Sequence, residues 1–346
     1  MRASRGCLSV VAALAVASAA QAFDHPLPGQ GPGANGARYA TDAYPGFDDE
    51  DEMTKPERKE PRWFAFINGP VCGTAKEQLA YCTELMQAGD YSKARKQLDA
   101  LVREWPTAPE APKAQQTLAE ICFEQLQDYE DAFAEYRYLL DFYSLQCDYE
   151  KMADRLYQMA GVLKAEGKEV MFVRFANTVD VRRAYETCVL RAPGAKWVPE
   201  AMLIIGSLRE DEGKNTEAIK VYENLRNIHR GTAEALEALR KEANVRMSVL
   251  REHEYNRSRC RDTINFMEMA LTECRPEDRP ALEQYVAEAK ALIAREAYLG
   301  AKFYDSSTRT RRSAINAYER FLAEYPESEH ADEVRARLEV LKGDER

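Results

Sequence analysis

The sequence predicts an all-α fold, a right-handed α-solenoid of about six helical hairpins, and two observations lead to this prediction. From Thr74 onward, apolar residues recur at steps of three and four, which places them along one face of an α-helix. One sequence template also recurs six times over the same region. A single hairpin cannot bury its apolar face alone, so repeated hairpins stack on their neighbours and form a solenoid.

The clearest hairpin lies within Ala291–Leu341, near the end of the chain. Its first helix ends near Tyr304, a polar turn follows, and its second helix ends at Tyr325-Pro326. Proline ends the helix because it has no N–H to donate and its ring clashes with the preceding turn. A further helix begins at His330. A helix, a turn, a second helix and a proline in this order are typical of the tetratricopeptide repeat.

The second helix of each hairpin follows a template of four positions. A small residue is followed by an apolar or aromatic residue four positions later, a large apolar residue seven later and a helix-ending residue twelve later. The copies are Ala94, Leu98, Leu101 and Pro106; Ala132, Tyr136, Leu139 and Ser144; Val181, Tyr185, Cys188 and Pro193; Ala218, Tyr222, Leu225 and Arg230; Cys260, Ile264, Met267 and Thr272; and Ala314, Tyr318, Phe321 and Pro326. We expect the small residue where the two helices of a hairpin approach most closely.

The first helix of each hairpin is predicted from the pattern that precedes each copy of the template. The expected ranges are Thr74–Ala88, Ala111–Leu126, Tyr149–Glu166, Val198–Glu212, Thr232–His253 and Ala281–Tyr304. Three of the turns that follow begin at Gly89, Gln127 and Gly213. A glycine at this place can adopt the left-handed conformation that ends a helix.

The N-terminal 60 residues are predicted to lie outside the solenoid. Residues 1–22 have the charges, the apolar run and the small residues of a cleavable signal peptide. The apolar run is shorter than the roughly 20 residues that span a bilayer, so we expect no transmembrane segment. Residues 23–60 are rich in proline, glycine and acidic residues, which predicts a disordered linker. The solenoid is then assigned to residues 61–346.

Composition and motifs argue against several classes of function. The net charge of −10 disfavours a general nucleic-acid-binding protein, which needs a basic face to bind phosphates. No GxSxG, HExxH or CxxC motif is present, and the four histidines lie far apart. We therefore predict no enzyme activity, no catalytic residue, no metal and no cofactor. Cys82, Cys188 and Cys260 fall at packing positions and are expected to be buried as small hydrophobic side chains.

One basic feature contrasts with the acidic composition. Arg257, Arg259 and Arg261 are predicted in the turn of the fifth hairpin, and Arg309, Arg311 and Arg312 in the turn of the sixth. Stacked repeats place equivalent turns side by side, so the six arginines are expected to form one basic ridge that binds an acidic patch on a partner. The alternative is that these arginines are solvated and face the acidic residues of their own helices.

The segment Ala291–Leu341 resembles the BamD-like family of outer-membrane protein assembly factors. The residues that carry the resemblance are Arg295-Glu296-Ala297-Tyr298-Leu299-Gly300-Ala301-Lys302-Phe303-Tyr304, Ala314-Ile315-Asn316-Ala317-Tyr318, and Tyr325-Pro326 with Ser328. The resemblance implies a periplasmic scaffold, peripheral at the outer membrane, that helps to fold and insert β-barrel proteins. The implied partners are the outer-membrane insertase and unfolded outer-membrane proteins.

Family members usually carry a lipid on a cysteine directly after the signal peptide. Here Phe23 follows Ala22, so no lipid anchor is predicted. An adaptor for cell-wall or cell-division machinery in the periplasm is therefore the main alternative function. A module that binds secreted polymers is a third.

Overall fold

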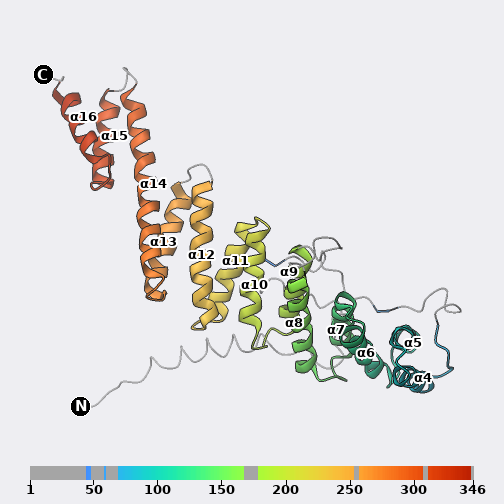
Figure 1. Ribbon diagram of the computed structural model, residues 1–346. Coiled ribbons are helices and arrows are strands. Elements are labelled where there is room, and N and C mark those ends of the chain that lie inside the picture. Colours follow the sequence, from blue (N-terminus) through green and yellow to red (C-terminus); the bar gives the residue numbers. More distant parts are fainter. Residues whose placement is uncertain are drawn as a thin grey trace, which may run out of the picture. The chain divides into compact units, whose positions relative to one another are not determined.

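The computed structural model describes residues 44–47, 58–59, 69–166, 178–252, 257–306 and 311–343. The predicted signal peptide, most of the predicted linker and Arg309 lie outside these ranges. Within them the chain forms thirteen α-helices and one π-helical turn, and no strand (Figure 1). The expected all-α solenoid of helical hairpins is confirmed.

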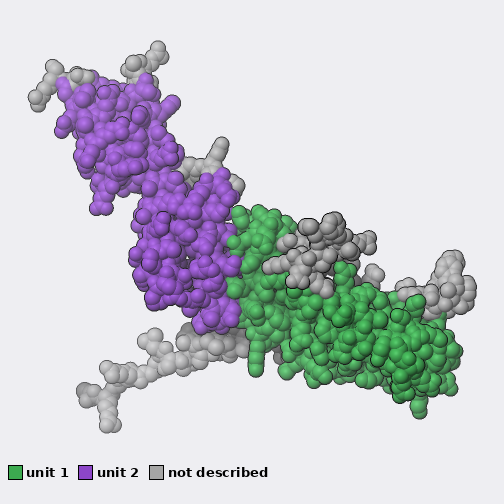
Figure 2. All heavy atoms as spheres, in the orientation of Figure 1, with its two compact units in different colours: residues 1–217 green, residues 218–346 purple. Residues whose placement is uncertain are grey.

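The chain divides into two compact units, residues 1–217 and 218–346 (Figure 2). In the first unit each helix packs against the next one along the chain. Its helices are α4 (Ala75–Gln87), α5 (Tyr91–Glu104), α6 (Ala111–Glu120), the π-helical turn η3 (Ile121–Gln125), α7 (Tyr129–Tyr143), α8 (Tyr149–Glu166), α9 (Thr178–Arg191) and α10 (Val198–Asp211). Helix α11 (Asn215–Ile228) begins at the end of this unit and continues into the second.

The second unit contains the last five helices. They are α12 (Ala233–Glu252), α13 (Arg257–Glu273), α14 (Arg279–Asp305), α15 (Arg311–Glu324) and α16 (Ala331–Gly343). Helix α14 has 27 residues, so it is about 40 Å long at 1.5 Å per residue. Along this length it packs first with α12 and α13 and then with α15, so one helix serves two hairpins.

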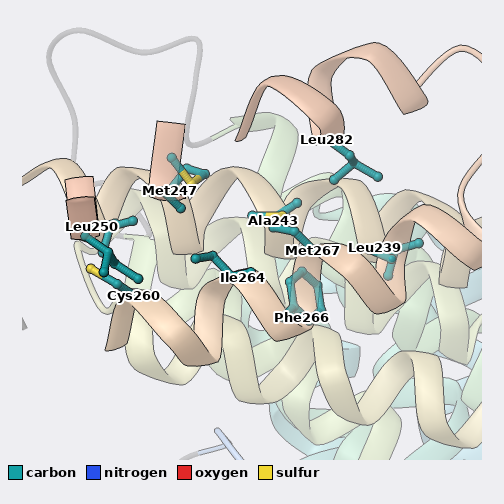
Figure 3. Packing of buried hydrophobic residues seen from close by; sticks show 12 residues of the cluster. Leu239, Ala243, Met247, Leu250, Cys260, Ile264, Phe266, Met267 and Leu282 are labelled. Atoms are coloured by element: carbon teal, nitrogen blue, oxygen red, sulfur yellow. The ribbon is translucent and has the colours of Figure 1, made fainter. Parts of the chain in front are cut away.

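Two apolar clusters lie along α14. The first joins α12, α13 and the N-terminal half of α14, and Figure 3 shows Met247, Ile264, Met267 and Leu282 within it. The second joins the C-terminal half of α14 to α15 and α16, with Phe321 nearly fully buried. Consecutive hairpins of this unit are therefore displaced along α14 by roughly half its length.

The packing template is confirmed in all six hairpins. The first three positions of every copy are buried, from Ala94, Leu98 and Leu101 in α5 to Ala314, Tyr318 and Phe321 in α15. The helix-ending position is correct in five copies and wrong at Thr272, because α13 continues to Glu273. The three cysteines at packing positions, Cys82, Cys188 and Cys260, are also buried.

The turns that end α4, η3 and α10 share one backbone conformation. Gly89, Gln127 and Gly213 have φ angles of 77°, 52° and 71°, all in the left-handed region. After α4 and α10 the two N–H groups that follow the helix donate back to its last turn, as in a Schellman motif. Gln127 is the one residue of the three that is not glycine. A residue with a side chain costs about 1–2 kcal/mol in this conformation, so the backbone at Gln127 is strained.

Substitutions at Gly89 and Gln127 should change the free energy of unfolding in opposite directions. We expect Gly89→Ala to lower the free energy of unfolding by about 1 kcal/mol, although no atom lies within 4 Å of the added carbon. Gln127→Gly should raise it by about 0.5 kcal/mol, because relief of strain exceeds the added flexibility of the unfolded chain. Urea denaturation followed by circular dichroism measures both. The same sign for the two variants would contradict this account.

A buried ion network joins α9 and α10. Arg182 and Arg209 are among the largest fully buried side chains, and Glu186 between them is 0% exposed. Arg182 contacts both carboxylate oxygens of Glu186 at 2.8 Å, and Arg209 Nη2 lies 3.2 Å from Glu186 Oε1. Glu212 completes the network, with its Oε1 2.6 Å from Arg182 Nε. Charged side chains therefore form part of the core of the first unit.

Candidate functional site

The structure separates the predicted arginines into two groups. Arg257, Arg259 and Arg261 lie in the first turns of α13, and Arg311 and Arg312 in the first turn of α15. Arg257 Nη2 lies 2.9 Å from Glu324 Oε2, at the C-terminal end of α15. Arg311 lies at the opposite end, where it donates to the main-chain carbonyl of Leu341.

The described arginines of the predicted ridge are therefore not brought together, and Arg309 lies outside the described residues. Helix α15 has 14 residues and is about 20 Å long, and the two groups of arginines lie at its two ends. The expectation assumed that equivalent turns of neighbouring hairpins lie side by side. The length of α14 removes this equivalence, because α15 packs on its C-terminal half. A role of either arginine group in binding a partner stays a prediction.

A different charged site lies on α5 and α7 in the first unit. It holds Lys59, which precedes α4 in the sequence. Lys59 Nζ lies 2.9 Å from Asp99 Oδ1 and 2.5 Å from Glu135 Oε2, and its side chain is 12% exposed. Two carboxylates thus neutralise one ammonium group that is almost removed from water, which makes their ion pairs stronger than surface pairs.

Aromatic residues of α7 complete the contacts of this basic segment. The main-chain N–H of Lys59 donates to Tyr138 Oη at 3.3 Å, and the ammonium group lies 5.2 Å from the centre of the same ring. The guanidinium of Arg58 lies 5.1 Å from the centre of the Phe142 ring. Glu135, Tyr138 and Phe142 are spaced three and four residues apart, so they lie on one face of α7. We call Asp99, Glu135, Tyr138 and Phe142 the lysine site.

Neighbouring side chains hold the two carboxylates of the lysine site in place. Gln115 of α6 donates to Glu135 Oε2 at 2.6 Å, and Arg103 donates from Nε to Asp99 Oδ2 at 2.8 Å. Burial raises the pKa of Asp99, but Lys59 and Arg103 outweigh burial and hold the pKa below its usual value. Asp99 is therefore ionised at neutral pH and available to bind a cation.

A cavity of about 750 Å³ extends from the lysine site along α5, α6 and α7. Asp99, Arg103 and Glu135 line it. Its other lining residues are Ser92, Arg95, Lys96, Leu118, Leu126, Asp128 and Asp131. The space is large enough to receive several residues of an extended peptide, and ligand-binding clefts in proteins have this size.

The C-terminal hairpin has a second exposed feature. Leu299, Phe303 and Tyr304 of α14 are 44%, 70% and 46% exposed, and Val340 of α16 is 51% exposed. A smaller cavity of about 420 Å³ lies between α14, α15 and α16 and is lined by Lys302, Asp305 and Arg337 among others. Exposed apolar side chains that gather in one region are typical of interaction surfaces.

The cysteines of the described residues are free thiols, seven in number. Burial raises the pKa of Cys82 to about 12 and that of Cys122 to about 11, so neither is a thiolate nucleophile at neutral pH. No group of three histidine, cysteine or acidic side chains within the described ranges is placed to hold a metal ion. In the same part of the chain, no helix combines the length and apolar character needed to cross a bilayer.

Comparison with known proteins identifies the repeat type in the first unit. Residues 83–145 match the tetratricopeptide repeat family. This segment is thus similar to tetratricopeptide repeats. It begins in α4, ends just after α7 and includes all four residues of the lysine site, and repeats of this type bind protein partners on their exposed faces.

Two solved structures are similar to the chain at low sequence identity. A tetratricopeptide repeat protein from Parabacteroides merdae is 16% identical, with 78% of this chain and 98% of that chain covered and a TM-score of 0.28. PilW, a type IV pilus biogenesis factor, is 16% identical, with 76% and 99% covered and a TM-score of 0.28. No curated protein matches the chain.

Proposed function

We propose that this protein is a non-enzymatic periplasmic scaffold of the BamD type, which binds protein partners during the assembly of outer-membrane β-barrel proteins. The resemblance to that family lies in Ala291–Leu341, which forms the C-terminal half of α14 together with α15 and most of α16. The tetratricopeptide repeat at residues 83–145 supports the broader role of a protein-binding scaffold.

The observation that carries the proposal is the exposure of apolar side chains within the segment of the resemblance. Leu299 and Phe303 are four residues apart on α14, so they lie on one face of this helix. Both are exposed, whereas Tyr298 and Ala301 of the same helix are buried against α15 and α16. Helix α14 therefore packs one face against α15 and α16 and exposes apolar side chains on another face, where a partner can bind.

The proposal is tested by crosslinking in cells followed by purification from envelope extracts. We expect a large outer-membrane β-barrel protein to be recovered with this chain. Recovery of peptidoglycan enzymes instead would favour the alternative, an adaptor for cell-wall or cell-division machinery. Recovery of the chain only as a free monomer would contradict both functions.

The same experiment tests the two arginine groups separately. If Arg259 and Arg261 bind an acidic patch, reversing both charges to glutamate should lower partner recovery roughly tenfold, because charge complementarity steers association. Reversal at Arg312 tests the group on α15. Lys220→Glu is the matched control, since Lys220 is an exposed cation of the same unit. Equal losses for the control and the arginine variants would show a general charge effect and no specific binding by either arginine group.

A further inference from the structure

We infer that the lysine site on α5 and α7 is a receptor for an extended segment of a partner protein that carries an adjacent arginine and lysine. We infer further that Arg58 and Lys59 of this chain occupy the receptor in cis and compete with the partner. The inference rests on the proposed scaffold function and names the chemistry of one class of partner.

The contacts of Lys59 select a lysine side chain together with the main-chain N–H of the same residue. Two carboxylate oxygens lie within 2.9 Å of the same nitrogen, which suits the compact charge of an ammonium group. The Tyr138 ring lies beneath that charge and its hydroxyl accepts the main-chain N–H of the same residue. The site thus binds both the side chain and the main-chain N–H of Lys59, and protein sites that bind peptides make both kinds of contact.

The residue before the lysine is also recognised. Arg58 is exposed, but its guanidinium lies over the Phe142 ring, and the rings of Tyr138 and Phe142 contact each other at a tilt of 43°, with ring centres 4.5 Å apart. A cation over an aromatic ring contributes favourably even at an exposed position. The two neighbouring rings of α7 therefore match two consecutive basic residues.

The lysine site is built by the folded repeat and does not depend on Lys59 for its shape. Asp99 and Glu135 belong to helices, and their orientations are fixed by Arg103 and Gln115. If Lys59 leaves, the carboxyl groups of Asp99 and Glu135 lose the ammonium group that both contact, and Arg103 remains bound to Asp99. This excess of negative charge favours the entry of another cation. The site is therefore ready to bind a lysine from any source.

The cavity next to the lysine site gives the partner an advantage over the cis segment. It continues from Asp99 and Glu135 to Asp128 and Asp131, with Arg95 between them. A partner segment of several residues can contact these groups as well as the lysine site. The cis segment has the advantage of tethering, which raises its effective concentration to the millimolar range. The tethered segment therefore competes with the partner and weakens its binding.

The test uses a labelled peptide with the sequence of residues 56–61, Pro-Glu-Arg-Lys-Glu-Pro, and the purified full chain. We expect Lys59→Ala to bind this peptide at least about tenfold more tightly than the unchanged protein, because the competitor has been removed. Lys76→Ala, at an exposed lysine of α4, should bind like the unchanged protein. Equal affinity for the Lys59→Ala and Lys76→Ala proteins, or no binding to either, would overturn the inference.

Variants of the receptor are made in the Lys59→Ala protein. Glu135→Gln should weaken peptide binding at least tenfold, whereas Glu130→Gln, at an exposed acid of the same helix, should leave it unchanged. Tyr138→Phe keeps the ring and removes the acceptor, and should weaken binding without affecting the fold. A peptide with alanine in place of the lysine should not bind. Unchanged affinity for Glu135→Gln and Tyr138→Phe, with circular dichroism showing folded proteins, would contradict the assignment of this site.

The outcomes separate this inference from the proposed function. A chain that captures a β-barrel partner in cells but does not bind the peptide after Lys59→Ala refutes only the lysine receptor. A chain that binds the peptide as expected but recovers no envelope partner refutes only the proposed function.

Discussion

Replacing Glu186 by glutamine is expected to lower the free energy of unfolding by about 3–5 kcal/mol. Glu186 is 0% exposed and contacts two buried guanidiniums, those of Arg182 and Arg209. Glutamine keeps the size of the side chain, so the change removes a charge and leaves the packing almost intact. The expected loss is therefore electrostatic.

The loss is large because the two arginines cannot lose their own charge. A guanidinium stays protonated at any pH at which the protein folds, and moving it out of water is costly unless an anion compensates. After the change Glu212 still contacts Arg182 and Arg209, which are 0% and 1% exposed, but the carboxylate that both arginines contact is gone. The carboxylate of Glu212 also contacts Lys214, so it is a weaker substitute for the charge that Glu186 loses.

Urea denaturation followed by circular dichroism measures the effect. The matched control is Glu84→Gln, at an exposed glutamate of α4, which should change stability by less than about 0.5 kcal/mol. A second variant, in which leucine replaces Glu186 and methionine replaces both Arg182 and Arg209, should recover much of the loss because no buried charge remains. Equal stability of Glu186→Gln and Glu84→Gln would show that the network is hydrated and does not belong to the core.

The contrast between this network and the apolar core shows which parts of the fold could be read from the sequence. Tyr136 and Phe321 were predicted because packing against the next helix repeats with a fixed spacing. Arg182 and Glu186 have the same spacing as a common surface ion pair on a helix. Nothing in the local sequence distinguishes the buried pair from a surface pair, since its burial depends on α10.

The candidate sites depended on tertiary structure in a similar way. The basic ridge was expected because each hairpin was assumed to stack in the same register, and the 27 residues of α14 change that register. The lysine site joins Lys59 to residues 40 and 76 positions away in the sequence. The only local feature of the sequence that indicates this site is the basic pair Arg58-Lys59 within an acidic stretch. Contacts between distant residues without a repeating pattern cannot be inferred from spacing.

Replacing Phe321 by alanine is expected to lower the free energy of unfolding by about 3–5 kcal/mol, which is typical of a large side chain removed from a packed core. Phe321 is 2% exposed and lies edge-on to Tyr298, with ring centres 6.1 Å apart. Phe303→Ala is the matched control, because Phe303 is also an aromatic residue of this hairpin but is 70% exposed. It should change stability by less than about 0.5 kcal/mol.

The loss at Phe321 should be confined to one end of the second unit. Phe321 belongs to the cluster formed by the C-terminal half of α14 with α15 and α16, whereas Ile264 and Met267 belong to the cluster around α12 and α13. Each repeat contacts mainly its neighbours, so a weakened terminal repeat opens before the others. Hydrogen exchange should then become faster in α15 and α16 and stay slow in α12. Uniformly faster exchange across the unit would instead mean that the two clusters unfold together, with Tyr325, which contacts both, as the link between them.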